Sequence, residues 1–178
     1  MRSVLAGWAL RRARRSDGAA TDRWLARSAR WSPGYSHAHA ELQRRLLAKG
    51  DHATALREAQ DANRRFPKNG DAWVLLGEAY RAMYRTKDAL VAFEQALMLE
   101  ERADAAMAAG AAYRQLGDWT NAGAQFARAY AAGAGPEALK ANAEMLRKAG
   151  DGQAAEEAER RWRDETSAGA RAAPEGTA

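Results

Sequence analysis

The sequence of 178 residues contains no cysteine. The chain can therefore form no disulfide, and it offers neither a thiolate nucleophile nor a cysteine metal site. It also has little in the way of long apolar runs: the run Val4 to Leu10 near the N-terminus is too short to span a bilayer, and the mean hydropathy is −0.62. No small-residue cleavage site of a secretory signal follows that run. These absences predict a cytoplasmic protein, or a periplasmic one if a native leader is missing from this sequence.

Signatures of catalysis are missing as well. The chain has no G-x-S-x-G, no H-E-x-x-H and no glycine loop that would hold a phosphate. Of its three histidines, His37 and His39 are two residues apart and would point to different sides of a helix, while His52 lies near an expected turn. We expect surface histidines without a metal. The prediction is a protein that is not an enzyme, with no catalytic residue, no metal and no cofactor.

The excess of positive over negative charge lies at the N-terminus. The formal net charge is +5, but residues 1–35 carry eight arginines against Asp17 and Asp22, a charge of +6, which leaves −1 on the other 143 residues. A basic N-terminal patch is expected from Arg11, Arg12, Arg14, Arg15, Arg23, Arg27 and Arg30. Such a patch could hold nucleic acid or an anionic membrane surface. Three tryptophans of this region, Trp8, Trp24 and Trp31, either fill the core of a helix pair or form a partner surface.

Large and small residues alternate with a period of 33 to 34 residues. In residues 70–100 the pattern consists of Trp73, Leu76, Gly77, Tyr80, Ala89, Phe93 and Ala96. The same register recurs one period later at Gly110, Tyr113, Ala122, Phe126 and Ala129, and one period earlier at Leu42, Leu46, Ala55, Ala59 and Ala62. In the earlier copy Gln43 replaces the glycine. Repeats of this length indicate a supersecondary unit that stacks on its neighbours.

The W-x2-L-G-x2-Y and A-x3-F patterns resemble the tetratricopeptide repeat (TPR), as found in bacterial proteins. The resemblance implies an all-α fold, a right-handed α-solenoid of about five helix pairs, of which three are clear and two are flanking capping pairs. The expected division is an Arg-rich TPR-like pair at 1–35, a TPR array at 36–164 and a disordered tail at 165–178, since the tail has no apolar period.

Glycines have two structural roles in this scheme. Gly77 and Gly110 are small because the two helices of a pair press together there. Gly50, Gly117 and Gly150, each followed by aspartate, mark turns between helices, because glycine adopts the left-handed conformation that ends a helix.

The resemblance implies a non-catalytic protein–protein interaction module, an adaptor or assembly scaffold. TPR proteins bind partner segments in a concave groove that the first helices of the pairs line. The register places the groove at Arg44, Val74, Leu75, Glu78, Arg81, Met107, Ala108, Ala111, Arg114 and Arg147. We expect a partner with an apolar segment for the middle of this groove and acidic residues for an edge made by Arg81, Arg114 and Arg147.

Three alternatives stay open. The edge arginines could instead pair with carboxylates of neighbouring helices. The protein could be a chaperone for a secreted or assembling client. It could also bind an anionic surface or nucleic acid through residues 1–35.

Overall fold

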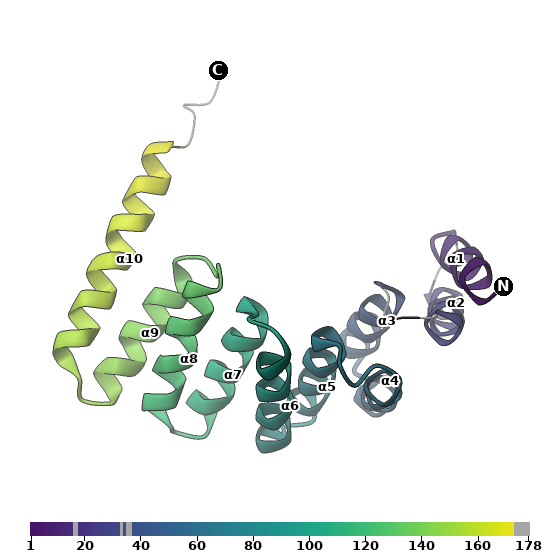
Figure 1. Ribbon diagram of the computed structural model, residues 1–178, viewed down its shortest axis with the longest axis horizontal. Coiled ribbons are helices and arrows are strands. Elements are labelled where there is room, and N and C mark those ends of the chain that lie inside the picture. Colours follow the sequence, from purple (N-terminus) through teal and green to yellow (C-terminus); the bar gives the residue numbers. More distant parts are fainter. Residues whose placement is uncertain (16–17, 33, 35–36, 173–178) are drawn as a thin grey trace. The chain divides into compact units, whose positions relative to one another are not determined.

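The computed structural model describes residues 1–15, 18–32, 34 and 37–172, and within these ranges all regular structure is helical (Figure 1). This confirms the predicted all-α class. The helices are α1 (Arg2–Ala13), α2 (Gly18–Trp31), α3 (His37–Ala48), α4 (His52–Arg65), α5 (Gly70–Ala82), α6 (Thr86–Leu99), α7 (Ala103–Gln115), α8 (Trp119–Ala131), α9 (Glu137–Lys148) and α10 (Gly152–Ala172).

The helices belong to two compact units, residues 1–99 with α1–α6 and residues 100–178 with α7–α10. The boundary after Leu99 divides the residues 36–164 that the sequence assigned to one array. The apolar period lapses at this point in the charged segment 100–102. Arg102 is held within the second unit, where its Nη1 lies 2.9 Å from Glu100 Oε1 and its Nη2 lies 2.8 Å from Asp104 Oδ2.

Within each unit, consecutive helices pack against one another. The first unit has one apolar cluster around Leu25, Leu42 and Leu46, and a second around Leu76. The second cluster includes buried alanines of α4, α5 and α6, with Trp73 packed at its side. The tryptophan of the repeat therefore contributes to the core, as its position in the pattern predicts.

The close approach of paired helices is confirmed in the second unit at Gly110. A Cβ at this position would lie 2.9 Å from two carbon atoms of the Phe126 ring. The corresponding pair α3–α4 has no glycine at this position. Gln43 takes the glycine position, is buried, and donates its side-chain amide to the backbone carbonyl of Leu75 in α5. Gln43, which departs from the repeat pattern, therefore links its helix pair to the next by a hydrogen bond.

The predicted glycine turns have the expected backbone. Gly50, Gly117 and Gly150 have φ of 75°, 78° and 89°. At each turn the following aspartate begins the next helix by accepting a backbone N–H, for example Asp118 Oδ1 from Asn121 N at 3.1 Å.

The turn between α5 and α6 has the same conformation without a glycine. Tyr84 has φ of 59°. Its N–H donates to Arg81 O at 3.0 Å and the N–H of Arg85 donates to Tyr80 O at 3.0 Å, which is the hydrogen-bond pattern at Gly117 and Asp118. Sequence reasoning did not detect this turn, because its marker residues are replaced.

Helix α10 is longer than predicted. Residues 165–172, expected to be disordered, are helical as the continuation of α10, so the prediction is wrong for them. Alanine, glutamate and arginine, which are strong helix formers, dominate this segment. Residues 173–178 of the predicted tail lie outside the described residues. No helix in the described part of the chain is long and apolar enough to cross a bilayer.

Candidate interaction surfaces

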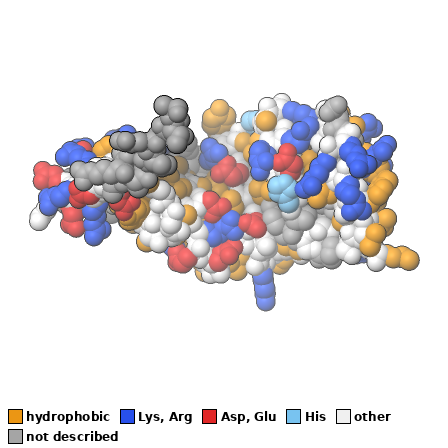
Figure 2. Space-filling model, turned by 90° about the horizontal axis from the view of Figure 1, so that it is seen from above, with side chains coloured by type: hydrophobic (Ala, Val, Ile, Leu, Met, Phe, Trp, Pro, Cys, Tyr) orange, Lys and Arg blue, Asp and Glu red, His pale blue; other side chains and the backbone are white. Residues whose placement is uncertain are grey.

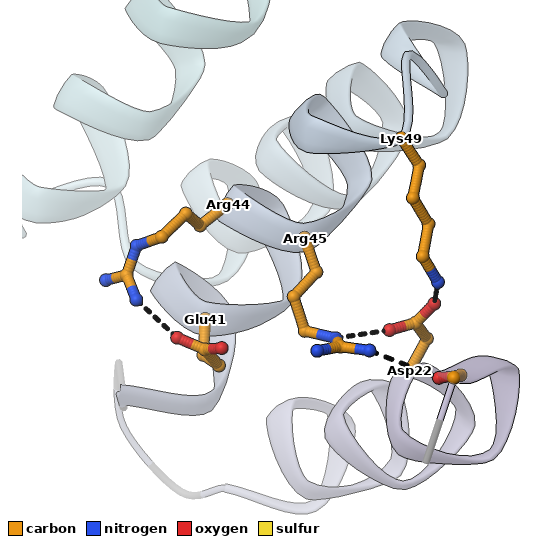
Figure 3. Close-up of polar contacts among 6 residues, drawn as sticks. Asp22, Glu41, Arg44, Arg45 and Lys49 are labelled. Atoms are coloured by element: carbon orange, nitrogen blue, oxygen red, sulfur yellow. Dashed lines mark hydrogen bonds and ion pairs between the residues drawn. The ribbon is translucent and has the colours of Figure 1, made fainter.

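The predicted groove residues of the first unit lie on α3 and α5. Val74, Leu75 and Glu78 are half-buried, and Arg81 is exposed. Leu75 packs against the apolar cluster around Leu76, so it is in part a core residue. Arg81 Nε lies 3.1 Å from Glu78 Oε2 on the same helix. The remaining residue, Arg44, is exposed and pairs with Glu41 one turn away on α3 (Figure 3).

The groove residues of the second unit lie on α7 and α9. Met107 packs against the cluster that contains Phe126 and Met145. Ala108 and Ala111 are half-buried. The predicted groove residues therefore form two sets, each on its own unit.

The three edge arginines differ in their partners. Arg81 pairs with Glu78, and Arg147 Nη2 lies 2.8 Å from Glu159 Oε2 of α10. Arg114 is exposed and has no ion-pair partner among the described residues. Arg147 therefore pairs with a carboxylate of a neighbouring helix, as the alternative expected, whereas the partner of Arg81 lies on its own helix. Exposed pairs of this kind contribute little to stability and exchange readily.

All seven arginines of the basic N-terminal patch are exposed, on α1 and α2 and in the turn after α1. Figure 2 shows Lys and Arg side chains interspersed with hydrophobic ones at the α1 end of the first unit. Within the described ranges, no ion pair is formed by Arg11, Arg14, Arg15, Arg23, Arg27 or Arg30. Arg27 instead places its guanidinium 4.7 Å over the ring of Trp24. Unpaired arginines at this density leave a positive surface that is available to an anionic partner.

Asp22, unlike these arginines, forms ion pairs with both of its carboxylate oxygens. It lies on α2 between Arg45 and Lys49 of α3 (Figure 3), with Arg45 Nε 2.7 Å from its Oδ1. Burial raises the pKa of the Asp22 carboxyl, but the hydrogen bonds from Lys49 and Arg45 outweigh it, so the pKa is lowered overall. Asp22 therefore joins the N-terminal helix pair to α3 and does not neutralise the exposed arginines.

The three N-terminal tryptophans divide between core and surface. Trp24 packs against the cluster around Leu25, and Trp31 is half-buried. Trp8 meets Trp24 edge to face, with ring centroids 5.0 Å apart, yet 48% of Trp8 stays exposed. Core filling thus accounts for Trp24, while Trp8 also contributes an apolar surface.

A cleft of about 720 Å³ lies between α1, α2, α3 and α4, and sequence reasoning missed it. It is lined by Arg2, Leu5, Ala29, Arg30, Trp31, His39, Glu58, Asp61, Ala62, Arg64 and Arg65. Arg65 closes one side by donating to the carbonyls of Ala29, Arg30 and Ser32 at 2.9 to 3.1 Å, at the end of α2. Burial, and then the charge of Asp61, raise the pKa of Glu58. Arg30 of the basic N-terminal patch lines the cleft, but no pattern in the sequence brings it together with Glu58 of α4.

The expectation of surface histidines is wrong for His39, which is buried and meets Phe66 edge to face at 5.7 Å between ring centroids. The contact with Phe66, which follows the end of α4, helps to enclose this ring. His52 Nδ1 lies 2.8 Å from the carbonyl oxygen of Ala82. The described residues contain no group of three or more histidine, aspartate or glutamate side chains placed to hold a metal ion.

A protein-family model described as "Bacterial transcriptional activator domain" matches residues 6–102. The chain belongs to this family. The match spans most of the first unit, so the helix pairs with the exposed arginines and the cleft are the part that defines membership. No curated protein sequence matches this chain.

Solved structures with a similar fold include TPR proteins. A crystal structure of MamA protein superposes with a TM-score of 0.79 at 14% identity, covering 98% of both chains. The thermophilic TPR protein TTC0263 of Thermus thermophilus superposes with a TM-score of 0.64 and 24% identity, over 92% of this chain and 89% of that one. MamA 41-end from Desulfovibrio magneticus RS-1 gives 0.72 at 17% identity, over 94% and 96%. The predicted TPR-type fold is thereby confirmed.

Proposed function

We propose that this protein is a non-catalytic interaction module of bacterial transcriptional activation, which binds a segment of another protein along the first helices of its TPR-type pairs. The observation that carries the proposal is the family match to residues 6–102, which falls on a unit built from such pairs. Fold likeness alone would not carry it, since one fold serves many functions.

Two surfaces support this role. Val74 on α5 and Ala111 on α7 are half-buried apolar residues that belong neither to the cluster around Leu76 nor to the cluster around Phe126, so each can contact a partner with little loss of packing there. Beside them lie Arg81 and Arg114, one with a weak exposed pair and one unpaired among the described residues. A partner segment with an apolar face and flanking acidic residues would match both surfaces.

The proposal is tested with a photo-crosslinking amino acid placed at Val74 or at Ala111 in the native cell. Both positions should trap the same partner protein. The control is Met98 on α6, which is also apolar and is more exposed than Val74 or Ala111, but lies on the second helix of its pair. Met98 should not trap that protein. The charge variants Val74→Glu and Ala111→Glu should then weaken binding of that protein at unchanged helicity.

Leu75→Glu and Met107→Glu are poorer variants for this purpose, because both side chains pack on core clusters. Equal trapping from Met98, or crosslinks from Val74 to nucleic acid in place of protein, would contradict the proposal.

A further inference from the structure

The outward side of α1 carries apolar and basic residues on one continuous face. Val4, Trp8, Arg11 and Arg15 follow one another at intervals of four, three and four residues, which places them on one side of a helix and its following turn. Met1 and Leu5 flank Val4 on the same side. We call these six residues the α1 face. The opposite side of the helix, with the buried Ala6, Ala9 and Ala13, packs toward α2 and the core.

The apolar half of the α1 face is open to solvent. Val4 is 69% exposed, Leu5 45% and Trp8 48%, and Met1 is fully exposed. A single exposed leucine would be ordinary, but four large apolar side chains on adjacent turns form a contiguous patch of the kind that marks an interaction site. Trp8 is fixed in place by its contact with Trp24, so it offers a rigid aromatic surface.

The second half of the α1 face is basic, and no nearby acidic side chain of the described residues neutralises its charge. Arg11 and Arg15 form no ion pair with any residue that the structure describes, and α1 itself contains no acidic residue. Arg27, over the ring of Trp24, adds a further positive charge from α2. A surface that fits the α1 face must therefore bring apolar side chains at one end and negative charge at the other.

A cleft beside this face decides the class of partner. Leu5 belongs to the α1 face and also lines the cleft of about 720 Å³, together with Trp31 and Ala62. Most of the other lining residues are charged, among them Arg2, Arg30 and Arg64. A protein segment can place an apolar side chain against Leu5 and Trp31 while its carboxylates meet these arginines. A lipid surface is flat on this scale and would leave the cleft unused, and a nucleic acid presents mainly phosphates and sugars, which would leave most of the apolar surface of Val4 and Leu5 uncovered.

We infer that the α1 face binds an acidic amphipathic helix of a partner protein, with its apolar side on Val4, Leu5 and Trp8 and its carboxylates on Arg11 and Arg15. This is a different surface from Val74 and Ala111. Failure of the inference would therefore leave the proposed function in place.

The test uses the full chain and a fluorescein-labelled synthetic helical peptide of about five turns, with leucines along one side and glutamates beside them. Fluorescence anisotropy should show saturable binding, weaker by at least about tenfold for a peptide of equal composition without the one-sided leucine pattern. Val4→Glu with Leu5→Glu should also reduce affinity by at least about tenfold. Both side chains are exposed, so the fold should be retained, which circular dichroism checks. Arg11→Gln with Arg15→Gln should weaken binding at about 50 mM salt and have less effect at about 500 mM.

The matched control is Val91→Glu with Met98→Glu, an exposed apolar pair on α6 that should leave affinity unchanged. Equal affinity of the Val4 and Leu5 variant and the native chain would overturn the inference. So would tighter binding to vesicles of phosphatidylglycerol and phosphatidylcholine, or to a DNA duplex, than to the peptide. Sedimentation that shows self-association lost in the Val4 and Leu5 variant would overturn it too, since a second copy would then occupy the α1 face.

Discussion

Gly77 of α5 lies directly against the ring of Phe93 of α6. A Cβ at position 77 would come within 2.6 Å of Phe93 Cδ1 and 2.8 Å of Cζ, distances that folded proteins do not tolerate. Both residues are buried and the ring is fully enclosed. Glycine is therefore required here for space, not for an unusual backbone angle.

Gly77→Ala should lower the free energy of unfolding by about 1–3 kcal/mol, because the added methyl group displaces a confined ring. Urea denaturation measures the change. The matched control is Gly7→Ala in α1, where the nearest atom to an added Cβ is Arg11 Nη1 at 4.0 Å. That variant should be stabilised by about 0.5–1 kcal/mol, since alanine favours helices. Changes of the same sign at both glycines would contradict the steric argument.

Tyr84→Gly should stabilise the protein by about 1 kcal/mol, because a non-glycine residue with φ of 59° is strained. Thermal unfolding should show a higher Tm. Gly117→Ala, at the equivalent turn with φ of 78°, should lower it by a similar amount. A lower Tm for Tyr84→Gly would show that the exposed tyrosine ring contributes packing that outweighs the strain.

Asp22→Asn should destabilise the first unit at neutral pH by on the order of 1–2 kcal/mol, since Arg45 and Lys49 lose a charged acceptor that is 17% exposed. The folded-state pKa of Asp22 is lowered, so its contribution is present above the unfolded-state pKa and is lost as pH falls through the folded-state pKa. The variant and the native chain should converge in acid. Glu144→Gln on α9, which breaks an exposed pair with Lys148, is the control and should change the free energy of unfolding little.

Glu58→Gln should raise the Tm at neutral pH. Burial and Asp61 raise the folded-state pKa of Glu58, so ionisation of this side chain opposes folding. Its contribution is favourable below the unfolded-state pKa and is lost as pH rises through the folded-state pKa, so the advantage of glutamine should shrink as the pH is lowered. Glu157→Gln on α10, a solvent-exposed position, is the control and should have no effect. An advantage that persists unchanged in acid would contradict the burial argument.

The sequence by itself determined the helix pairs, their repeat length and the turns at Gly50, Gly117 and Gly150. These features repeat every 33 to 34 residues and depend on local chemistry: a small residue where paired helices cross, except at Gln43, and a glycine followed by aspartate at Gly50, Gly117 and Gly150. A periodic pattern reports such features because every copy repeats the same short-range requirement. The turn at Tyr84 could not be predicted in this way, because Tyr84 and Arg85 replace the glycine and aspartate that mark the other turns. The backbone hydrogen bonds of the turn are nevertheless the same.

Only the tertiary structure decided which residues of each helix face the solvent where the repeat is degenerate. Trp8 and Trp24 look alike in the sequence, yet Trp24 packs on the core and Trp8 stays half exposed, because no described helix of the first unit covers the outer side of α1. Likewise, Gln43 reaches the carbonyl of Leu75, 32 residues away, and the cleft at Glu58 draws its walls from four helices. These arrangements depend on contacts between residues distant in the chain, and a pattern of neighbouring residues does not predict such contacts.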